Sequence, residues 1–499
     1  MMSDPAVHRW VAAQGDYAAA GRRAVLWAVT FNVLAVVHST QAQEVAGLQA
    51  AISLQQALVQ AIARGEKSVV AIARVRKIER RGGGSRLRPN PPDPTDPEFI
   101  PNEFATGVVV DPRGLILTNY HVLGEVDQCE YYVATSEHKV YKALRVKAAD
   151  PWSDLAILEL DAADLVPITF ANLAAKGLKK GQIVITLGNP YAIARDGQVS
   201  AGWGIISNLT RKAVRIPKQP SEPNEPTMHH YGTLIQTDAK LNLGTSGGAL
   251  LNLNGEMIGL TTSLAALSGY EKPAGFAIPV DATFLRIVEL LKAGHEVEYG
   301  FLGVGPENLA ASEHLRGRHG ARVREIVQGT PAARSSLNRG DVITQIDGQR
   351  VYDVDGLLLG LGRLPVERVA RLTIDRDGLV FHADVKLSKK SPSLQRRAIV
   401  TAKVPTWRGI RVDYSTALPG FKGLDVNLDA AGYVAVTAVN PDSDAWKAGL
   451  RPGQFISHVE EIRVSTPKQF LAAVGQRQGR VRLRFAGPTG DGRTHVTVP

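Results

Sequence analysis

Residues 244–250 read GTSGGAL and carry the residue types of a serine nucleophile. A serine hydroxyl attacks a carbonyl efficiently only when a base accepts its proton. The small residues around Ser246 let the backbone turn sharply and leave its side chain open. They also let the amides of Gly244 and Ser246 point at one spot, where an oxyanion would be stabilised. By itself the motif fits a plain glycine-rich turn equally well, since Gly and Ser are common turn residues.

Two further residues are candidates for the partners that such a serine needs. His121 ends a β-type run that begins at Gly114, and Asp154 opens a second apolar run at 155–160. An imidazole would take the serine proton, and a partly buried carboxylate would orient that imidazole. Taken singly, His121 also fits a structural histidine, and Asp154 fits a strand-entry residue that accepts local amide hydrogen bonds.

Composition places the chain among ordinary globular proteins. Its 499 residues suggest about three domains, at roughly 150 residues per domain. A hydrophobic fraction of 44% and a charged fraction of 21% exclude a largely disordered chain, a collagen and a polytopic membrane protein. The net charge of +10 is a mild bias and weak evidence for nucleic acid, so we expect no nucleic-acid partner.

The side chains that could hold a cofactor are few. Cys129 is the only cysteine, which excludes an intramolecular disulfide and a cysteine-based zinc site. His229 and His230 lack a partner at metal-site spacing, and the glycines at 356–362 lack the strand-to-helix context of a phosphate loop. We therefore expect no metal ion, no cofactor and no use of ATP.

Residues 1–42 have the pattern of a targeting segment. Arg22 and Arg23 precede an apolar run at 24–37, which is short of the roughly 20 residues that a membrane helix needs. Small residues follow, and we predict a signal peptide cleaved after Ala42. A retained membrane anchor and a buried cytoplasmic helix are the alternatives. A signal peptide predicts a periplasmic or secreted protein, and an anchor predicts one attached to the membrane by its N-terminus.

Residues 43–295 carry the pattern of one β-rich domain. Between 107 and 279, short β-type runs alternate with Gly, Pro and Asn turns, which indicates a sandwich or a barrel. Helical patterns at 45–63 and 282–293 flank this region. The Arg-, Gly- and Pro-rich stretch at 74–97 predicts an exposed loop.

An internal repeat follows the β-rich domain. Residues 337–343 (LNRGDVI) align with the string LRPGQFI, which lies 113 residues further on. Each copy follows a Pro-containing turn and precedes a second turn and strand. Two copies indicate two similar modules rather than a solenoid. We assign these modules to 296–388 and 405–499, joined by a linker at 389–404.

Several strings together resemble the HtrA/Deg branch of chymotrypsin-like serine proteases, and no single one is as specific. They are TNYHV (118–122), SDLAIL (153–158), LGNP (187–190), IQTDA (235–239), GTSGGAL (244–250) and FAIP (276–279). The resemblance implies a mainly β fold, with a double β-barrel protease domain followed by two α+β PDZ-like domains. It implies that Ser246 is the nucleophile, His121 the base and Asp154 the residue that orients it.

The resemblance also places an oxyanion hole on the amides of Gly244, Thr245 and Ser246. Two residues of this loop depart from the family pattern, because Thr245 stands where the family usually has Asn and Leu243 where it usually has Pro. Both lie on the loop that must be ordered for activity. The departures therefore raise the question of whether the loop needs a ligand to adopt its active form.

The first repeat matches the carboxylate-binding loop of PDZ domains. The matching residues are Gly300, Phe301, Leu302 and Gly303, and the corresponding stretch at 407–412 matches less well. PDZ domains bind C-terminal peptides by adding a strand to a sheet edge. The resemblance implies an ATP-independent serine endopeptidase for unfolded or damaged cell-envelope proteins, active in stress response and protein quality control. It also implies a homotrimer or larger assembly. The alternative is a proteolytically idle PDZ scaffold or chaperone.

Overall fold

The computed structural model describes residues 47–77, 103–189, 197–213, 226–262, 274–392, 396–418, 421, 432–475, 477–486 and 492–499. The predicted signal segment, and the predicted loop beyond residue 77, lie outside these ranges. A helix covers 47–65, close to the expected 45–63. Contacts divide the chain into a unit that ends at Ala61 and a unit from Ile62 onward, and the barrels and the C-terminal modules all belong to the second unit. Among the described residues, no helix is long and apolar enough to cross a membrane.

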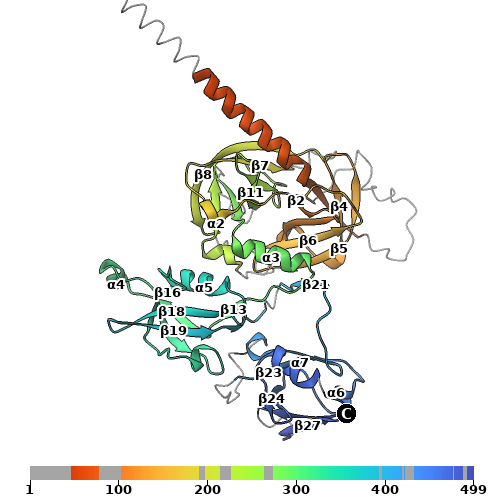
Figure 1. Ribbon diagram of the computed structural model, residues 1–499, viewed down its shortest axis with the longest axis vertical. Helices are drawn as coiled ribbons and strands as arrows, with labels where there is room; N and C mark the ends of the chain where they lie inside the picture. Colours follow the sequence, from red (N-terminus) through yellow and green to blue (C-terminus); the bar gives the residue numbers. More distant parts are fainter. Residues whose placement is uncertain are drawn as a thin grey trace, which may run out of the picture. The chain divides into compact units, whose positions relative to one another are not determined.

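Six antiparallel strands form the first barrel (Figure 1). They are β1 (Val69–Arg76), β2 (Glu103–Asp111), β3 (Leu115–Asn119), β4 (Cys129–Ala134), β5 (Val140–Asp150) and β6 (Leu155–Leu160). The order is β5-β4-β1-β2-β3-β6, and pairing of β5 with β6 closes the ring. Ile72, Ile116 and Leu158 are fully buried inside it, which is what alternating apolar strands predict. Strand β1 continues to Arg76, so residues 74–76, which we expected to belong to a loop, are strand.

Six further strands close into a second barrel in the order β10-β11-β12-β9-β8-β7. They are β7 (Ile183–Gly188), β8 (Ser200–Arg211), β9 (Leu234–Thr237), β10 (Ala249–Leu251), β11 (Met257–Thr262) and β12 (Gly275–Pro279). A short helix, α2 (Leu173–Lys176), precedes it, and β7 contacts β1 and β2 of the first barrel. Helix α3 (Ala282–Lys292) follows, and it begins where Asp281 accepts hydrogen bonds from two first-turn amides. The double barrel confirms the expected fold class.

The two C-terminal modules have the same strand order. The first contains β14 (Val304–Asn308), β15 (Ala321–Ile326), β16 (Val342–Ile346), β17 (Gln349–Arg350), β18 (Val369–Arg376), β19 (Leu379–Lys386), α4 (Ala311–Leu315) and α5 (Val354–Gly362). The second contains β22 (Ile410–Tyr414), β23 (Val434–Val439), β24 (Phe455–Val459), β25 (Ile462–Arg463), β26 (Val481–Phe485), β27 (His495–Val498), α6 (Asp444–Lys447) and α7 (Pro467–Gly475). In both modules five strands form an antiparallel path, with a short strand paired to its third member. The predicted repeat is therefore a repeat in structure.

The segments that connect the domains contribute short strands of their own. Strand β13 (Gly300–Phe301), which follows the second barrel and α3, pairs with β20 (Ser388–Lys389) at the end of the first module. Strand β21 (Ile399–Val400), within the predicted linker, pairs with β5 of the first barrel. The connecting segments are thus themselves paired in sheets, and the linker between the two modules pairs with a strand of the first barrel.

Candidate active site

Asp154 lies in the tight turn between β5 and β6. It has a φ of +56°, and its side chain is only 2% exposed. The carboxylate accepts a hydrogen bond from the backbone amide of His121 (3.0 Å) and another from its imidazole Nδ1 (2.9 Å to Oδ2). The backbone carbonyl of Asp154 also accepts from the amide of Tyr120 (2.9 Å). The turn is therefore bonded to the segment that carries His121 by both its side chain and its backbone.

This contact decides which imidazole nitrogen carries the proton. A carboxylate can only accept, so Nδ1 of His121 is the donor in the pair. The lone pair of the neutral ring then lies on Nε2, which is the protonation state that a general base requires. The His121 side chain is 28% exposed, so one side of the imidazole is accessible from solvent.

Ser246 lies in the turn before β10, and this turn packs against the first barrel. Its carbonyl accepts a hydrogen bond from the amide of Thr106 on β2 (2.9 Å). The next residue, Gly247, has a φ of +85°, and a Cβ there would lie 2.1 Å from the Thr106 carbonyl and 2.4 Å from the Thr118 hydroxyl. Only glycine permits this approach. Because Thr118 is three residues before His121, the serine turn of one barrel faces the histidine segment of the other.

The loop before Ser246 is held by hydrogen bonds within itself and to the first barrel. The amide of Thr245 donates to the carbonyl of Asn242 (3.2 Å), and its hydroxyl donates to the same oxygen (2.7 Å). The carbonyl of Gly244 accepts from the Thr106 hydroxyl (2.7 Å). The Thr245 amide is therefore used within the loop. Of the three amides predicted for the oxyanion hole, those of Gly244 and Ser246 remain as candidates. Leu243, where the family usually has proline, is 58% exposed.

His229 supports the turn that carries Asp154. From the sequence we considered this residue only as a candidate metal ligand. It is fully buried, its Nε2 donates to the Ser153 carbonyl (2.8 Å), and its Nδ1 accepts from the Thr233 hydroxyl (2.6 Å). His230 instead bonds to Thr227 at the start of the same 3-10 turn. No group of three metal-binding side chains occurs among the described residues.

The predicted peptide loop of the first module leads into β14, which pairs only with β15 and is the edge strand of its sheet. Gly303 has a φ of +90°, and a Cβ there would lie 2.1 Å from the Thr330 hydroxyl. The amide of Gly300 is used within the fold, since it donates to the Leu364 carbonyl (2.7 Å). Of the four predicted residues, Gly300 and Phe301 lie on β13, and Leu302 is buried.

In the second module, the loop that corresponds to 300–303 makes contacts with other parts of its own module. Arg408 donates to the carbonyls of Gly479 (2.6 Å) and Val498 (2.9 Å), so its guanidinium ties the loop to the last strand. The Trp407 ring packs edge-on against Phe470, with ring centroids 6.0 Å apart. These contacts agree with the weaker match of this stretch to a carboxylate loop.

Two antiparallel barrels, with a buried aspartate bonded to a histidine on one and a serine in a glycine-rich turn on the other, define a chymotrypsin-like serine peptidase. Comparison with known proteins agrees with this class. Residues 105–260 match the trypsin-like peptidase domain family, and residues 300–387 match the PDZ domain family.

Several relatives match most of the chain. The chain is 31% identical to a probable periplasmic serine endoprotease DegP-like of Chlamydia trachomatis, covering 75% of this chain and 70% of the relative. A protein of the same description from Pseudomonas fluorescens is 31% identical, covering 77% of each chain. The solved HtrA-type protease AlgW with tripeptide has a TM-score of 0.50 and 25% identity, covering 67% of this chain and 98% of its own. This chain belongs to the DegP-like, HtrA-type family of serine endoproteases.

The buried His229 makes a prediction about stability and pH. Burial lowers the pKa of its imidazole, with smaller lowering by His230 and Arg363 against raising by the Ser153 carbonyl and Asp154. In the unfolded chain the pKa returns to about 6.5, so below that pH the unfolded state binds a proton that the folded state does not. We expect the free energy of unfolding to fall with pH below about 6.5, by up to about 1.4 kcal/mol per pH unit from this residue.

Urea unfolding of the full chain between pH 5 and pH 8 measures how the free energy of unfolding depends on pH. His229→Gln should flatten the slope below pH 6.5, whereas His138→Gln, at an exposed hairpin position, should leave it unchanged. Equal slopes in wild type and His229→Gln would contradict the assignment.

Proposed function

We propose that Ser246, His121 and Asp154 are the catalytic triad of this endoprotease. The observation that carries the proposal is the buried Asp154 carboxylate on Nδ1 of His121, which presents Nε2 as the base. Ser246 attacks the scissile carbonyl, His121 accepts its proton and returns it to the leaving amine, and Asp154 stabilises the imidazolium that forms. The amides of Gly244 and Ser246 stabilise the oxyanion.

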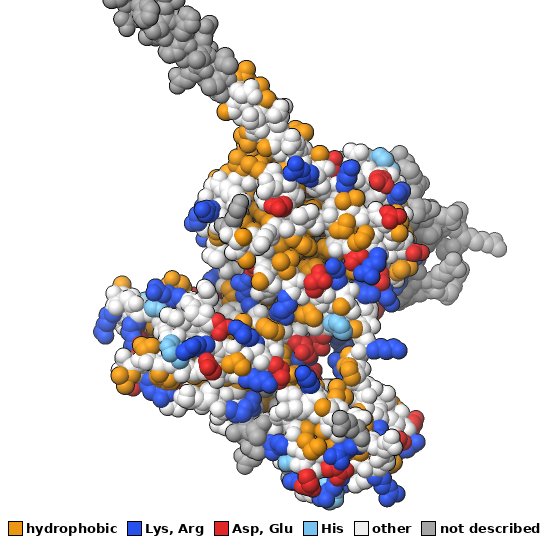
Figure 2. Space-filling view, in the orientation of Figure 1, with side chains coloured by type: hydrophobic (Ala, Val, Ile, Leu, Met, Phe, Trp, Pro, Cys, Tyr) orange, Lys and Arg blue, Asp and Glu red, His pale blue; other side chains and the backbone are white. Residues whose placement is uncertain are grey.

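The proposal extends to substrate and setting. Relatives named periplasmic serine endoproteases support a periplasmic location and protein substrates. We propose, as the resemblance implies, that these substrates are unfolded or damaged envelope proteins. We further propose that the chain forms a homotrimer or larger assembly, and that domains span 43–295, 296–388 and 405–499. In the view of Figure 2, basic and acidic side chains are interspersed rather than gathered into one basic face, which favours protein substrates over nucleic acid.

A ligand role for the first module rests on the position of β14 at the edge of its sheet and on the loop that leads into it. AlgW, the structural relative, was solved with a tripeptide, and β14 leaves one edge open for an added strand. We propose that C-terminal peptides bind along β14 with their carboxylate at Leu302 and Gly303. The idle-scaffold alternative has less support, because the relatives are named endoproteases and the Asp154–His121 pair is intact.

The triad predicts the effect of single substitutions. Ser246→Ala and His121→Ala should each lower kcat by roughly 10⁴-fold or more, because nucleophile and base act as a unit. Casein turnover and phosphonate labelling measure this, with Ser207→Ala on β8 as the control that should retain activity. Substantial cleavage by Ser246→Ala, or labelling of another residue in wild type, would contradict the triad.

The loop before Ser246 predicts specificity. No acidic residue lies between Lys240 and Ser246, and the nearest one, Asp238, accepts a hydrogen bond from the Ile205 amide (2.7 Å). A buried lysine or arginine side chain without a carboxylate partner would be very costly. We expect cleavage after Val, Ala, Ile or Leu, as read by mass spectrometry of casein fragments. Predominant cleavage after Arg or Lys would refute this.

The carboxylate loop predicts activation by peptide. Couplings between sites are typically about 1–3 kcal/mol, so hydrophobic C-terminal peptides should raise cleavage of a chromogenic substrate roughly 5- to 150-fold at saturation. Gly303→Ala should abolish this activation, because its Cβ would displace the loop from Thr330. Gly340→Ala is the matched control, since its φ is also positive (+98°) but nothing lies within 4 Å of an added Cβ. Equal activation of both variants would contradict the site.

A further inference from the structure

The turn that presents Asp154 is anchored from inside by a second buried carboxylate, Asp150. It ends β5, is 4% exposed, and its Oδ2 accepts from the Ser153 amide (2.9 Å) and the Ser153 hydroxyl (2.5 Å). Ser153 immediately precedes Asp154, and its carbonyl is held by His229. The backbone on which Asp154 depends is therefore held at every polar atom of Ser153.

Asp150 has one more donor, which comes from outside the barrel. The hydroxyl of Tyr299 donates to the same Oδ2, across a separation of 149 residues. Tyr299 is 5% exposed and lies between α3 and β13, on the segment that joins the protease domain to the first PDZ module. Its ring packs edge-on against Trp152, with centroids 6.4 Å apart.

A buried carboxylate depends on its donors. Burial raises the pKa of Asp150, and the hydrogen bonds from Ser153, from the Tyr299 hydroxyl and from the Trp152 backbone oppose that shift. Loss of one donor leaves a desolvated charge short of a partner, and the turn must move to replace it. Ser153 is bonded to Asp150 through its amide and hydroxyl, so a shift of the Asp150 carboxylate would move Ser153 and, with it, the adjacent Asp154.

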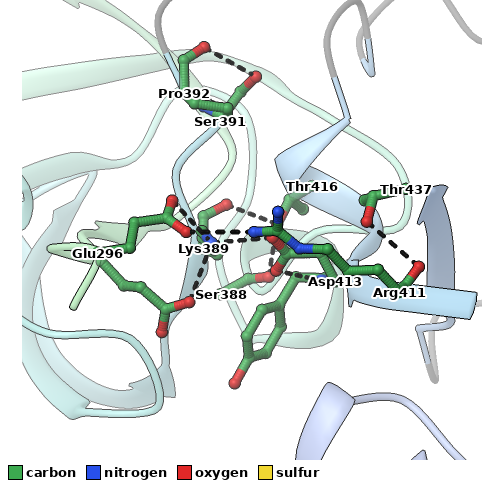
Figure 3. A network of polar contacts seen from close by, with 11 residues as sticks. Glu296, Ser388, Lys389, Ser391, Pro392, Arg411, Asp413, Thr416 and Thr437 are labelled. Atoms are coloured by element: carbon green, nitrogen blue, oxygen red, sulfur yellow. Dashed lines mark hydrogen bonds and ion pairs between the residues drawn. The ribbon is translucent and has the colours of Figure 1, made fainter. Parts of the chain in front are cut away.

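The segment that carries Tyr299 is itself held by a buried lysine. The amine of Lys389, on β20, lies 3.0 Å from Glu296, 2.9 Å from Glu298 and 2.8 Å from Asp413 of β22 (Figure 3). Its side chain is 3% exposed, and although burial alone would lower its pKa, the three carboxylates raise it. In addition, the Lys390 amide donates to the carbonyl of Tyr299 (2.8 Å).

We propose that Tyr299 is a positioning residue for catalysis, which acts through Asp150 and Ser153 to hold the Asp154 carboxylate against His121. The connection between protease domain and PDZ module is then part of the support of the triad. This inference rests on the proposed function, since it concerns the orientation of a proposed triad member. It differs from a purely structural role because the lost hydroxyl acts on turnover rather than on substrate binding.

The test is Tyr299→Phe in the full chain, which keeps the ring against Trp152 and removes only the hydroxyl. We expect kcat for a short chromogenic peptide to fall roughly 10-fold, the size of a lost hydrogen bond to a charged group, with KM within about twofold. Tyr132→Phe is the matched control, because it removes a hydroxyl that donates to the Glu130 carboxylate (3.1 Å) on β4. Its kcat should equal that of wild type.

A double-mutant cycle that combines Tyr299→Phe with Asp150→Asn tests whether Tyr299 acts through Asp150. If Tyr299 acts through Asp150, its substitution adds no further loss of kcat in the Asp150→Asn background. Additive losses, or an unchanged kcat in Tyr299→Phe, would overturn the inference while leaving the triad intact.

Hydrogen exchange gives a readout that does not need activity. Tyr299→Phe should speed exchange of the Ser153 amide roughly 10-fold or more, while the Tyr132→Phe control should not. Unchanged exchange would overturn the inference even if wild type proved inactive. An inactive wild type with this faster exchange would instead overturn the proposed function and leave the support of the turn by Tyr299 standing.

Discussion

Two carboxylates are buried four residues apart in one turn, and each must be paired because an isolated buried charge is very costly. Asp154 is satisfied on the side of the active site, by the amide and imidazole of His121. Asp150 is satisfied on the opposite side, by Ser153 and by Tyr299. The need to pair both charges orients the turn, so that one carboxylate faces His121 and the other connects the turn to the segment that carries Tyr299.

The division of the candidate triad between two barrels makes their interface part of the site. Thr106 on β2 joins three features there, because its amide donates to the Ser246 carbonyl, its hydroxyl donates to the Gly244 carbonyl, and the same hydroxyl accepts from the Asn189 amide. Thr106 therefore holds the serine loop in a fixed position against the first barrel. Precise docking of this kind is what catalytic geometry requires, since small misplacements of reacting groups are costly.

The two C-terminal modules show how a repeated fold acquires different roles. Asp341 and Gln454 occupy equivalent positions in the two repeats. Each side chain accepts a hydrogen bond from the backbone amide three residues before it. Both modules therefore keep this turn, although only the first has a charged residue there. The loop at 300–303 leads to an open sheet edge, whereas Arg408 ties the matching loop to the last strand of its own module. The two modules share a fold, and a few side chains decide whether the loop next to the edge strand can serve as a peptide-binding site.

The sequence by itself determined the class of protein and the identity of its chemistry. The residue types around His121, Asp154 and Ser246 predict the roles of these three residues. The alternating apolar runs predict barrels, and the repeat predicts paired modules. Tertiary structure alone decided what holds them. His229 reaches Ser153 across 76 residues and Tyr299 reaches Asp150 across 149, and Lys389 meets carboxylates from two other segments. Such pairings leave no local pattern, because a buried polar group can be satisfied by any residue that the fold brings within hydrogen-bonding distance.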